Sequence, residues 1–246
     1  MPSAPTRIIL VTGASRGIGA EVARQLGGAD THVIVNYREK AKRAEQIAAD
    51  IRSAGGSAST LAADISDEAA AVAMMQTVKA RFGRLDALVL NASGGLELGA
   101  DPGYAMRLNR DAQRRLALLS LPLMPAGGRI VFVTSHQAHF FPNKAVPKGY
   151  SAVAASKRAG ETALFMMRSQ FDRAGIHFTV VSGDMIDGTI IVRLLERRDP
   201  DAVDSRRSVA PLPTVDQFAT AIANAANSSS SAGIVYVGGS DYLATA

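Results

Sequence analysis

Residues 12–19 read Thr12-Gly13-Ala14-Ser15-Arg16-Gly17-Ile18-Gly19 and directly follow a short apolar run, residues 7–11. A run of this kind is typical of a buried strand, and the apolar spacing of residues 17–27 indicates a helix. Gly13 permits a tight turn, whereas Gly17 and Gly19 allow a close approach of the backbone. A glycine-rich turn between a first strand and the N-terminus of a first helix is suited to bind the pyrophosphate of a dinucleotide.

The alternation of strands and helices continues along the whole chain. The residues predict strands at 7–11, 31–36, 57–63, 86–90, 129–134, 176–182 and 234–237. They predict helices at 17–27, 39–53, 66–82, 104–121, 151–173 and 215–226. Strict alternation means parallel strands joined by right-handed crossovers. We therefore expect one α/β domain over residues 1–246, a Rossmann-like doubly wound parallel sheet of about seven strands in three layers. This context favours a dinucleotide site over a plain turn that is merely rich in glycine.

The composition excludes several classes of protein. Hydrophobic residues make up 47% and charged residues 20% of the 246 residues, which is typical of a globular chain. Because there is no cysteine, disulfides and thiolate metal sites are excluded, and we predict no metal site and a cytoplasmic location. The sequence contains no signal peptide and no apolar run of membrane-spanning length, and its net charge of +5 comes from scattered residues. We therefore expect neither membrane nor nucleic acid as a partner.

The end of the second strand bears on which dinucleotide is bound. NAD(H) sites favour an acidic residue there, which bonds the ribose 2′-hydroxyl. This chain has Asn36-Tyr37-Arg38 instead. Arg38 and Arg16 are suited to hold a 2′-phosphate, because guanidinium groups pair well with phosphate. The residues predict NADP(H) in preference to NAD(H), the alternative being that both arginines are ordinary surface residues.

The Thr-Gly-x-x-x-Gly-x-Gly spacing of the turn resembles that of the short-chain dehydrogenase/reductase family, and further matching positions follow in the family's order along nearly the whole chain. Asn91-Ala92-Ser93-Gly94 resembles the family's Asn-Asn-Ala-Gly segment, and Gly183 and Thr189 resemble its Pro-Gly-x-x-x-Thr stretch. With the second-strand residues above, the resemblance implies a cofactor site formed by Gly13, Ser15, Arg16, Gly17, Ile18, Gly19, Asn36, Tyr37, Arg38, Asp64, Ile65, Asn91, Ala92, Ser93, Lys157, Gly183 and Thr189.

The family transfers hydride to or from a carbonyl carbon, and the resemblance implies which residues take part. Ser135 resembles the serine that fixes the carbonyl oxygen, Lys157 the lysine that holds the nicotinamide ribose, and Asn109 the asparagine that supports a water chain. A tyrosine supplies the proton, and the lysine lowers the pKa of that tyrosine. The resemblance thus implies an NADPH-dependent oxidoreductase for a small carbonyl or alcohol substrate, similar to 3-oxoacyl-thioester reductases.

The position of the tyrosine departs from the family pattern. The family's tyrosine lies four residues before the lysine, where this chain has Val153. The nearest tyrosine upstream is Tyr150, seven residues before Lys157, and seven residues return to nearly the same face of a helix. We predict that Tyr150 is a displaced proton donor. The predicted catalytic residues are Ser135, Tyr150, Lys157 and Asn109.

Two alternatives to Tyr150 stay open. Another group such as His136, His139 or a water supplies the proton, or the site binds NADP(H) without catalysis, as a sensor or scaffold. The plainer interpretation of both histidines is that they are exposed in a loop. Two other departures alter the surroundings: Asn91 and Asn109 are only 18 positions apart, and Ser182 replaces the family's proline.

Residues 185–213 lie where the family has its variable substrate lid. Their charges are mixed, which favours a solvated helix face over contact with an acidic carrier. Before the predicted catalytic helix, Phe140, Phe141 and Pro142 are suited either to line a substrate pocket or to form an oligomer contact. The resemblance implies a homodimer or homotetramer. The arginines of the lid are Arg193, Arg197, Arg198, Arg206 and Arg207.

Overall fold

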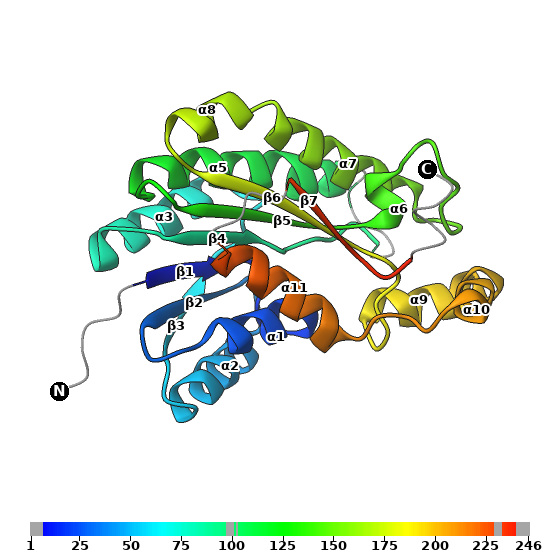
Figure 1. The fold of residues 1–246 in the computed structure, drawn as a ribbon, viewed down its shortest axis with the longest axis horizontal. Helices are drawn as coiled ribbons and strands as arrows, with labels where there is room; N and C mark the ends of the chain where they lie inside the picture. Colours follow the sequence, from blue (N-terminus) through cyan, green and yellow to red (C-terminus); the bar gives the residue numbers. More distant parts are fainter. Residues whose placement is uncertain (1–6, 97–100, 102, 229–232, 240–246) are drawn as a thin grey trace.

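The structure is a computed structural model that describes residues 7–96, 101, 103–228 and 233–239 (Figure 1). At its centre is a seven-stranded parallel sheet in the order β3-β2-β1-β4-β5-β6-β7. The order reverses between β1 and β4, the point where doubly wound sheets bind ligands. The predicted fold class is confirmed. The strands are β1 (Arg7–Val11), β2 (Thr31–Tyr37), β3 (Ser57–Ala62), β4 (Ala87–Leu90), β5 (Arg129–Ser135), β6 (His177–Gly183) and β7 (Ile234–Val237).

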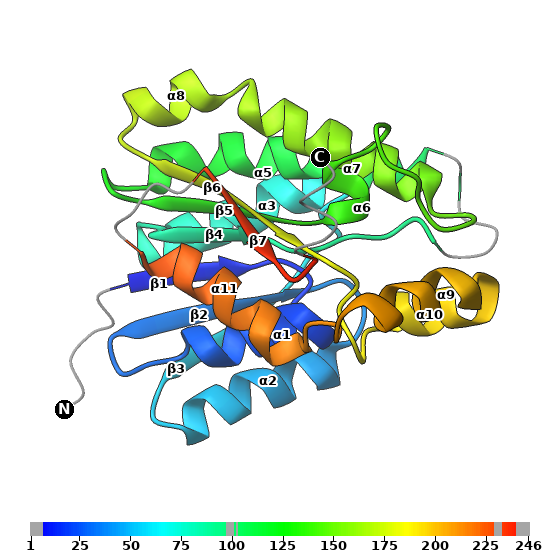
Figure 2. The ribbon, with the colours of Figure 1, turned by 45° about the vertical axis from the view of Figure 1, so that its right-hand side comes forward.

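Helices cover both faces of the sheet, which gives three layers (Figure 2). On one face lie α1 (Gly17–Leu26), α2 (Ala41–Ser53) and α11 (Val215–Asn227). On the other lie α3 (Glu68–Phe82), α5 (Gln113–Ser120), α7 (Ser151–Phe165) and α8 (Arg168–Arg173). In β1, Ile9 and Val11 join the first core, and Ile8 and Leu10 join the second. Because both faces of the strand are covered, its sequence is continuously apolar rather than alternating.

The predicted helix at 104–121 is not uniform. It consists of α4 (Tyr104–Met106), a π-helical stretch η1 (Arg107–Ala112) and α5, and a 3₁₀ turn η2 (Leu121–Leu123) follows. A π-helical stretch is an unusual element that often marks a functional position, and η1 contains Asn109. Helix α7 packs so closely on η1 that a Cβ added at Gly160 would collide with the Asn109 carbonyl oxygen.

The prediction of a single helix over residues 151–173 is wrong, because α7 ends at Phe165 and α8 begins at Arg168. The Met167 N–H donates to the Leu164 carbonyl oxygen at 3.0 Å, a bond across three residues that tightens the chain at this point. Met167 is buried in the same core as Phe171, whereas Met166 is 79% exposed. The break thus places one of two adjacent methionines in the core and the other in solvent.

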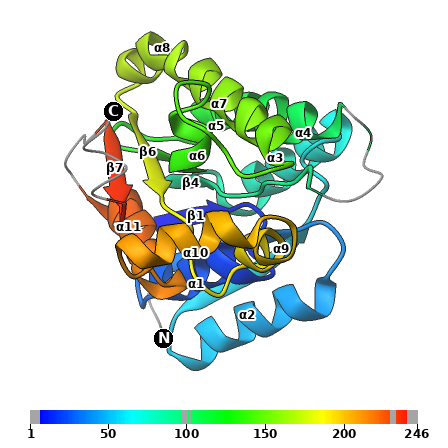
Figure 3. The same cartoon turned by 90° about the vertical axis from the view of Figure 1, so that its right-hand side faces the viewer.

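Two helices form the predicted lid beyond the carboxyl ends of the strands (Figure 3). They are α9 (Ile190–Arg198) and α10 (Pro200–Val209). The Arg207 guanidinium pairs with Asp187 at 3.0 Å and with Glu196 at 2.7 Å, so part of the lid's charge forms a partly exposed ion-pair network. No helix within the described residues is long and apolar enough to cross a membrane.

Candidate active site

The turn between β1 and α1 has the backbone shape that a bound phosphate needs. Gly13 and Gly17 have φ angles of +64° and +55°, which side-chain-bearing residues rarely adopt. A Cβ added at Gly19 would lie 2.7 Å from the Gly13 carbonyl oxygen, so that position also requires glycine. No side chain of the described residues caps α1 at Arg16, and its first N–H groups are therefore available to an anion. Ser15 and Ile18 lie in this turn, partly buried.

Asn36 supports the turn from behind. Its Oδ1 accepts a hydrogen bond from the Gly13 N–H at 3.2 Å. Its Nδ2 donates to the carbonyl oxygens of Leu61 and Ala63, both at 3.2 Å. The residue is only 2% exposed, so its side chain joins β2, β3 and the turn rather than facing solvent.

Thr12 joins the turn to the segment after β4, a role that sequence reasoning missed. Its Oγ1 accepts hydrogen bonds from the N–H groups of Asn91 and Ala92, both at 3.0 Å. The Asn91 Nδ2 donates to the Thr12 carbonyl oxygen at 2.9 Å. These bonds hold the carboxyl ends of β1 and β4 together and place residues 91–93 beside the turn. The threonine preceding Gly13 was the available signal.

Arg38 and Asp64 lie at the ends of β2 and β3, on the far side of the turn. The Arg38 Nε forms an ion pair with Glu39 at 2.9 Å, and its side chain is 46% exposed. Its Nη1 donates to the Tyr104 hydroxyl, so Arg38 is oriented by a residue that the sequence analysis did not select. The Asp64 Oδ1 accepts from the N–H and the hydroxyl of Ser66 at 2.9 and 2.7 Å, and the neighbouring Ile65 is buried.

Ser135 and Tyr150 are brought together, although 15 residues separate them. Ser135 is the last residue of β5, and Tyr150 immediately precedes α7. The Ser135 Oγ lies 3.4 Å from the Tyr150 hydroxyl. Tyr150 is 5% exposed and shares a small apolar cluster with Val153, the residue at the family's tyrosine position. Burial raises the pKa of the Tyr150 phenol, and the hydrogen bond with Ser135 opposes part of this rise.

Lys157 lies on α7 two turns after Tyr150. Burial lowers the pKa of its ammonium group to about 8, and the nearby Glu161 carboxylate limits the decrease. Glu161, one turn further along α7, is fully buried. Its Oε1 accepts hydrogen bonds from Arg158 at 2.7 Å and binds the His139 Nδ1 at 2.8 Å. Sequence reasoning missed Glu161, although its spacing of four from Lys157 indicates a shared helix face.

Asn109 lies between the segment after β4 and α7. Its Nδ2 donates to the Gly94 carbonyl oxygen and to the Ser156 Oγ, both at 2.9 Å. Its Oδ1 accepts from the Gly94 N–H at 3.3 Å. Asn109 is 1% exposed, so its side chain fixes η1 against the residue that precedes Lys157.

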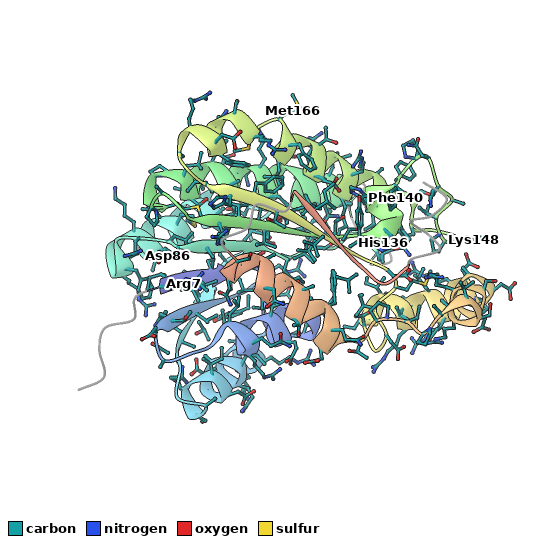
Figure 4. The ribbon with its side chains drawn as sticks, viewed as in Figure 1. Arg7, Asp86, His136, Phe140, Lys148 and Met166 are labelled. Atoms are coloured by element: carbon teal, nitrogen blue, oxygen red, sulfur yellow. The ribbon has the colours of Figure 1, made fainter. Side chains whose placement is uncertain are left out.

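The expectation that His136 and His139 are exposed loop residues is wrong. They form a short helix α6 (His136–His139), whose N-terminus is capped by Ser135: its Oγ accepts the Ala138 N–H at 3.3 Å. His136 is fully buried, and Figure 4 shows it near Phe140 at the lid end of the molecule. Its Nε2 lies 3.1 Å from the Gly238 carbonyl oxygen, which can only accept, so Nε2 carries the proton and Nδ1 accepts from the Ser182 hydroxyl at 2.8 Å.

The other histidine is held as firmly. The His139 Nδ1 lies 2.8 Å from the Glu161 carboxylate, and its Nε2 lies 3.0 Å from the Tyr236 hydroxyl. The ring nitrogens of both histidines are therefore occupied by protein groups. This arrangement makes either histidine a poor substitute for Tyr150 as proton donor.

Gly183 and Thr189 begin and end the connection from β6 to the lid. A Cβ added at Gly183 would lie 2.6 Å from the Phe218 ring, so a side chain does not fit there. The Thr189 Oγ1 caps α9 by accepting the Val192 N–H at 3.3 Å. Between them, Asp184 forms a buried ion pair with Arg206 of α10 at 2.6 Å. This pair ties the lid to β6, and sequence reasoning missed it because the two residues lie 22 positions apart.

Comparisons with known proteins identify the family of this chain. The family model described as short chain dehydrogenase matches residues 7–199. The chain is 33% identical over 189 residues to 1-cyclohexenylcarbonyl-CoA reductase of Streptomyces collinus, which covers 74% of this chain and 65% of that protein. The chain spans about three fifths to two thirds of the length of the first curated relatives it matches.

Two solved structures are similar over nearly their full length. One is gluconate 5-dehydrogenase from Burkholderia cenocepacia in complex with NADP and tartrate, with a TM-score of 0.81, 25% identity, and 98% of this chain and 96% of that chain covered. The other is the angucycline C-6 ketoreductase LanV with bound NADP, with a TM-score of 0.79, 25% identity, and 96% and 97% covered. On the strength of the family match and these similarities, the chain belongs to the short-chain dehydrogenase family.

Proposed function

We propose that this protein is an NADPH-dependent oxidoreductase that reduces the carbonyl group of a small molecule. The observation that carries the proposal is the 3.4 Å distance between the Ser135 Oγ and the Tyr150 hydroxyl, at the start of the helix that carries Lys157. Related proteins with reductase names and similar structures with bound NADP support it.

The residues present fit a bound dinucleotide. The uncapped N-terminus of α1 and the two glycines of positive φ suit its pyrophosphate. The half-exposed guanidinium of Arg38 and the exposed Arg16 suit a 2′-phosphate. We therefore propose NADP(H) rather than NAD(H) as the cofactor. We also propose that the other residues of the predicted cofactor site contact this dinucleotide. The bound nicotinamide supplies the hydride for reduction.

The proposed roles of the catalytic residues follow from their protonation and contacts. The Tyr150 phenol is protonated at neutral pH, since its ordinary pKa of 10.0 is well above 7 and burial raises it, so it has a proton to donate to the carbonyl oxygen. Ser135 donates a hydrogen bond to the same oxygen. Lys157 holds the ribose and, while charged, favours the phenolate that forms as the proton leaves. Asn109 positions α7 through its bond to Ser156.

The substrate class is the finer part of the proposal. We propose a 3-oxoacyl thioester or a cyclic ketone. The name of the relative 1-cyclohexenylcarbonyl-CoA reductase favours a thioester, and the name of the ketoreductase LanV favours a cyclic ketone. We also propose a homodimer or homotetramer. In support, a shallow and largely apolar hollow of about 460 Å³ lies on α7 and η1 beside the exposed Met166.

The test is NADPH oxidation with a panel of 3-oxoacyl thioesters, quinones and cyclic ketones, for the native protein and for Tyr150→Phe. We expect the substitution to lower kcat by about 10²–10⁴-fold while NADPH binding is retained. Tyr236→Phe, which removes a tyrosine hydroxyl that contacts His139 rather than Ser135, is the comparison, and we expect it to lower kcat far less than Tyr150→Phe does. Equal rates for Tyr150→Phe and native protein would contradict the role of Tyr150. NADPH binding without turnover of any carbonyl would favour a binding protein without catalysis.

A further inference from the structure

A polar cavity lies at the opposite end of the sheet from the candidate active site. Its volume is about 370 Å³. Figure 4 shows two of its residues, Arg7 and Asp86, at the end of the molecule away from His136 and Lys148. The amino-terminal ends of β1 and β5 and the chain just before β4 form it. Its polar lining residues are Arg7, Arg84, Asp86, Arg129 and Asn227.

Arg129 is the unusual member of this cavity. It is the first residue of β5, and only 9% of it is exposed. Its backbone N–H donates to the Asp86 carbonyl oxygen at 3.0 Å, but no described residue forms a hydrogen bond or ion pair with its guanidinium. Buried charges in proteins are normally paired, because removing an unpaired ion from water is costly. The Arg129 guanidinium lines this cavity without a protein partner among the described residues, so an anion that enters the cavity can pair with it.

The one carboxylate in the cavity does not neutralise Arg129. The Asp86 Oδ2 accepts hydrogen bonds from the Ile8 N–H at 2.8 Å and from the Arg84 Nε at 3.0 Å, and its Oδ1 is paired with the same arginine. Among the described residues, the Arg7 guanidinium donates to two neutral oxygens, the Asn227 Oδ1 at 2.7 Å and the Ala226 carbonyl at 2.9 Å. The cavity thus contains three guanidinium groups and one carboxylate, and that carboxylate is already paired with Arg84.

The electrostatics point in the same direction. Burial lowers the pKa of Arg129, and the positive charge of Arg7 lowers it further. A bound anion would offset both effects, because pairing with a negative charge favours the charged form of each guanidinium group. Arg84, half exposed at the rim, can contribute further charge while the rest of a larger ligand extends into solvent.

We propose that this cavity is a binding site for a small phosphate-bearing anion, held between the guanidinium groups of Arg7 and Arg129. The planar guanidinium fork forms paired hydrogen bonds with phosphate oxygens, so two of them can bind one phosphate group on different sides. Both inorganic phosphate and a phosphate monoester present this chemistry. The site is separate from the turn at residues 12–19, because it lies beyond the other ends of the strands.

Inorganic phosphate is the first probe, titrated against sodium chloride of equal ionic strength and followed by the melting temperature and by calorimetry. The titration is done with saturating NADP⁺, so that phosphate cannot occupy the turn, and is repeated without it. Arg129→Met removes one of the two guanidinium groups that are proposed to bind the phosphate. Arg114→Gln removes one exposed charge from α5 and is the charge-matched control.

We expect saturable stabilisation of the native protein and of Arg114→Gln, with the phosphate affinity of Arg129→Met lowered at least about tenfold. If Arg129→Met does not fold, Arg129→Lys takes its place. This variant keeps the positive charge without the planar guanidinium group, and we expect its phosphate affinity to be lower than that of the native protein but not abolished. No phosphate effect beyond that of chloride, or an equal effect in Arg129→Met, would overturn the proposal. Tighter binding of glycerol 3-phosphate than of inorganic phosphate would identify a monoester as the ligand, and the reverse would identify free phosphate.

Discussion

Lys157 makes the stability of the fold depend on pH in a way that can be measured. Its pKa in the folded protein is about 8, compared with an ordinary value of 10.5, because partial burial of the side chain disfavours the charged form. Between these two pH values the unfolded chain binds the proton more tightly than the folded protein does. The unfolding free energy contributed by Lys157 therefore rises as the pH increases from about 8 to about 10.5. The gap between the two pKa values corresponds to about 3 kcal/mol.

The perturbation is Lys157→Met, and the assay is urea unfolding at pH 7 and at pH 10. Since other groups also titrate over this range, the quantity of interest is the difference in unfolding free energy between native protein and variant. We predict that this difference shifts in favour of the native protein by about 2–3 kcal/mol on going to pH 10. Lys79→Met, which removes an exposed lysine of α3, should show little shift. A pH-independent difference for Lys157→Met would refute the reasoning.

Three further predictions concern the cofactor and the lid. Replacing Arg38 by leucine should weaken NADPH binding at least about tenfold and leave NADH binding nearly unchanged, because only NADPH carries the 2′-phosphate; equal losses in fluorescence titrations would contradict this. Gly19→Ala should strongly weaken binding of both cofactors, since the added methyl group meets the Gly13 carbonyl oxygen; retained affinity in the same titrations would show that the turn can relax. Arg206→Met should lower the unfolding free energy by about 3–5 kcal/mol, because it leaves the buried Asp184 carboxylate without this partner. Adding Asp184→Asn to the same chain should restore part of that loss. If urea unfolding shows that the losses of the two substitutions simply add, the two residues are not coupled.

The fold was predictable because its signals are local and repeated. The apolar run at residues 7–11, the glycine turn after it and the alternation beyond it all favour one doubly wound sheet, and the seven strands lie where they were predicted. The break at Met166 and Met167 was not predictable, because helical periodicity continues through both residues and only packing against Phe171 distinguishes them. The π-helical stretch around Asn109 packs against Gly160, which lies 51 residues further along, and no local pattern reveals this contact.

The candidate site was predictable where the chain itself sets the geometry. The turn at residues 12–19 and Ser135 at the end of β5 follow from strand positions. The environment of His136 was not predictable, because it requires Ser182 and Gly238 from two other parts of the chain. The same holds for the Asp184–Arg206 pair, since burial of both charges becomes evident only when the lid is placed on the sheet.

We propose that Tyr150 performs the task of the tyrosine that is missing at Val153. A crystal structure of the protein with NADP⁺ and a carbonyl ligand tests it most directly. We expect the carbonyl oxygen to lie within hydrogen-bond distance, about 3 Å, of both the Tyr150 hydroxyl and the Ser135 Oγ. A ligand oxygen that contacts Ser135 while Tyr150 stays out of reach, with a histidine or an ordered water in its place, would contradict it.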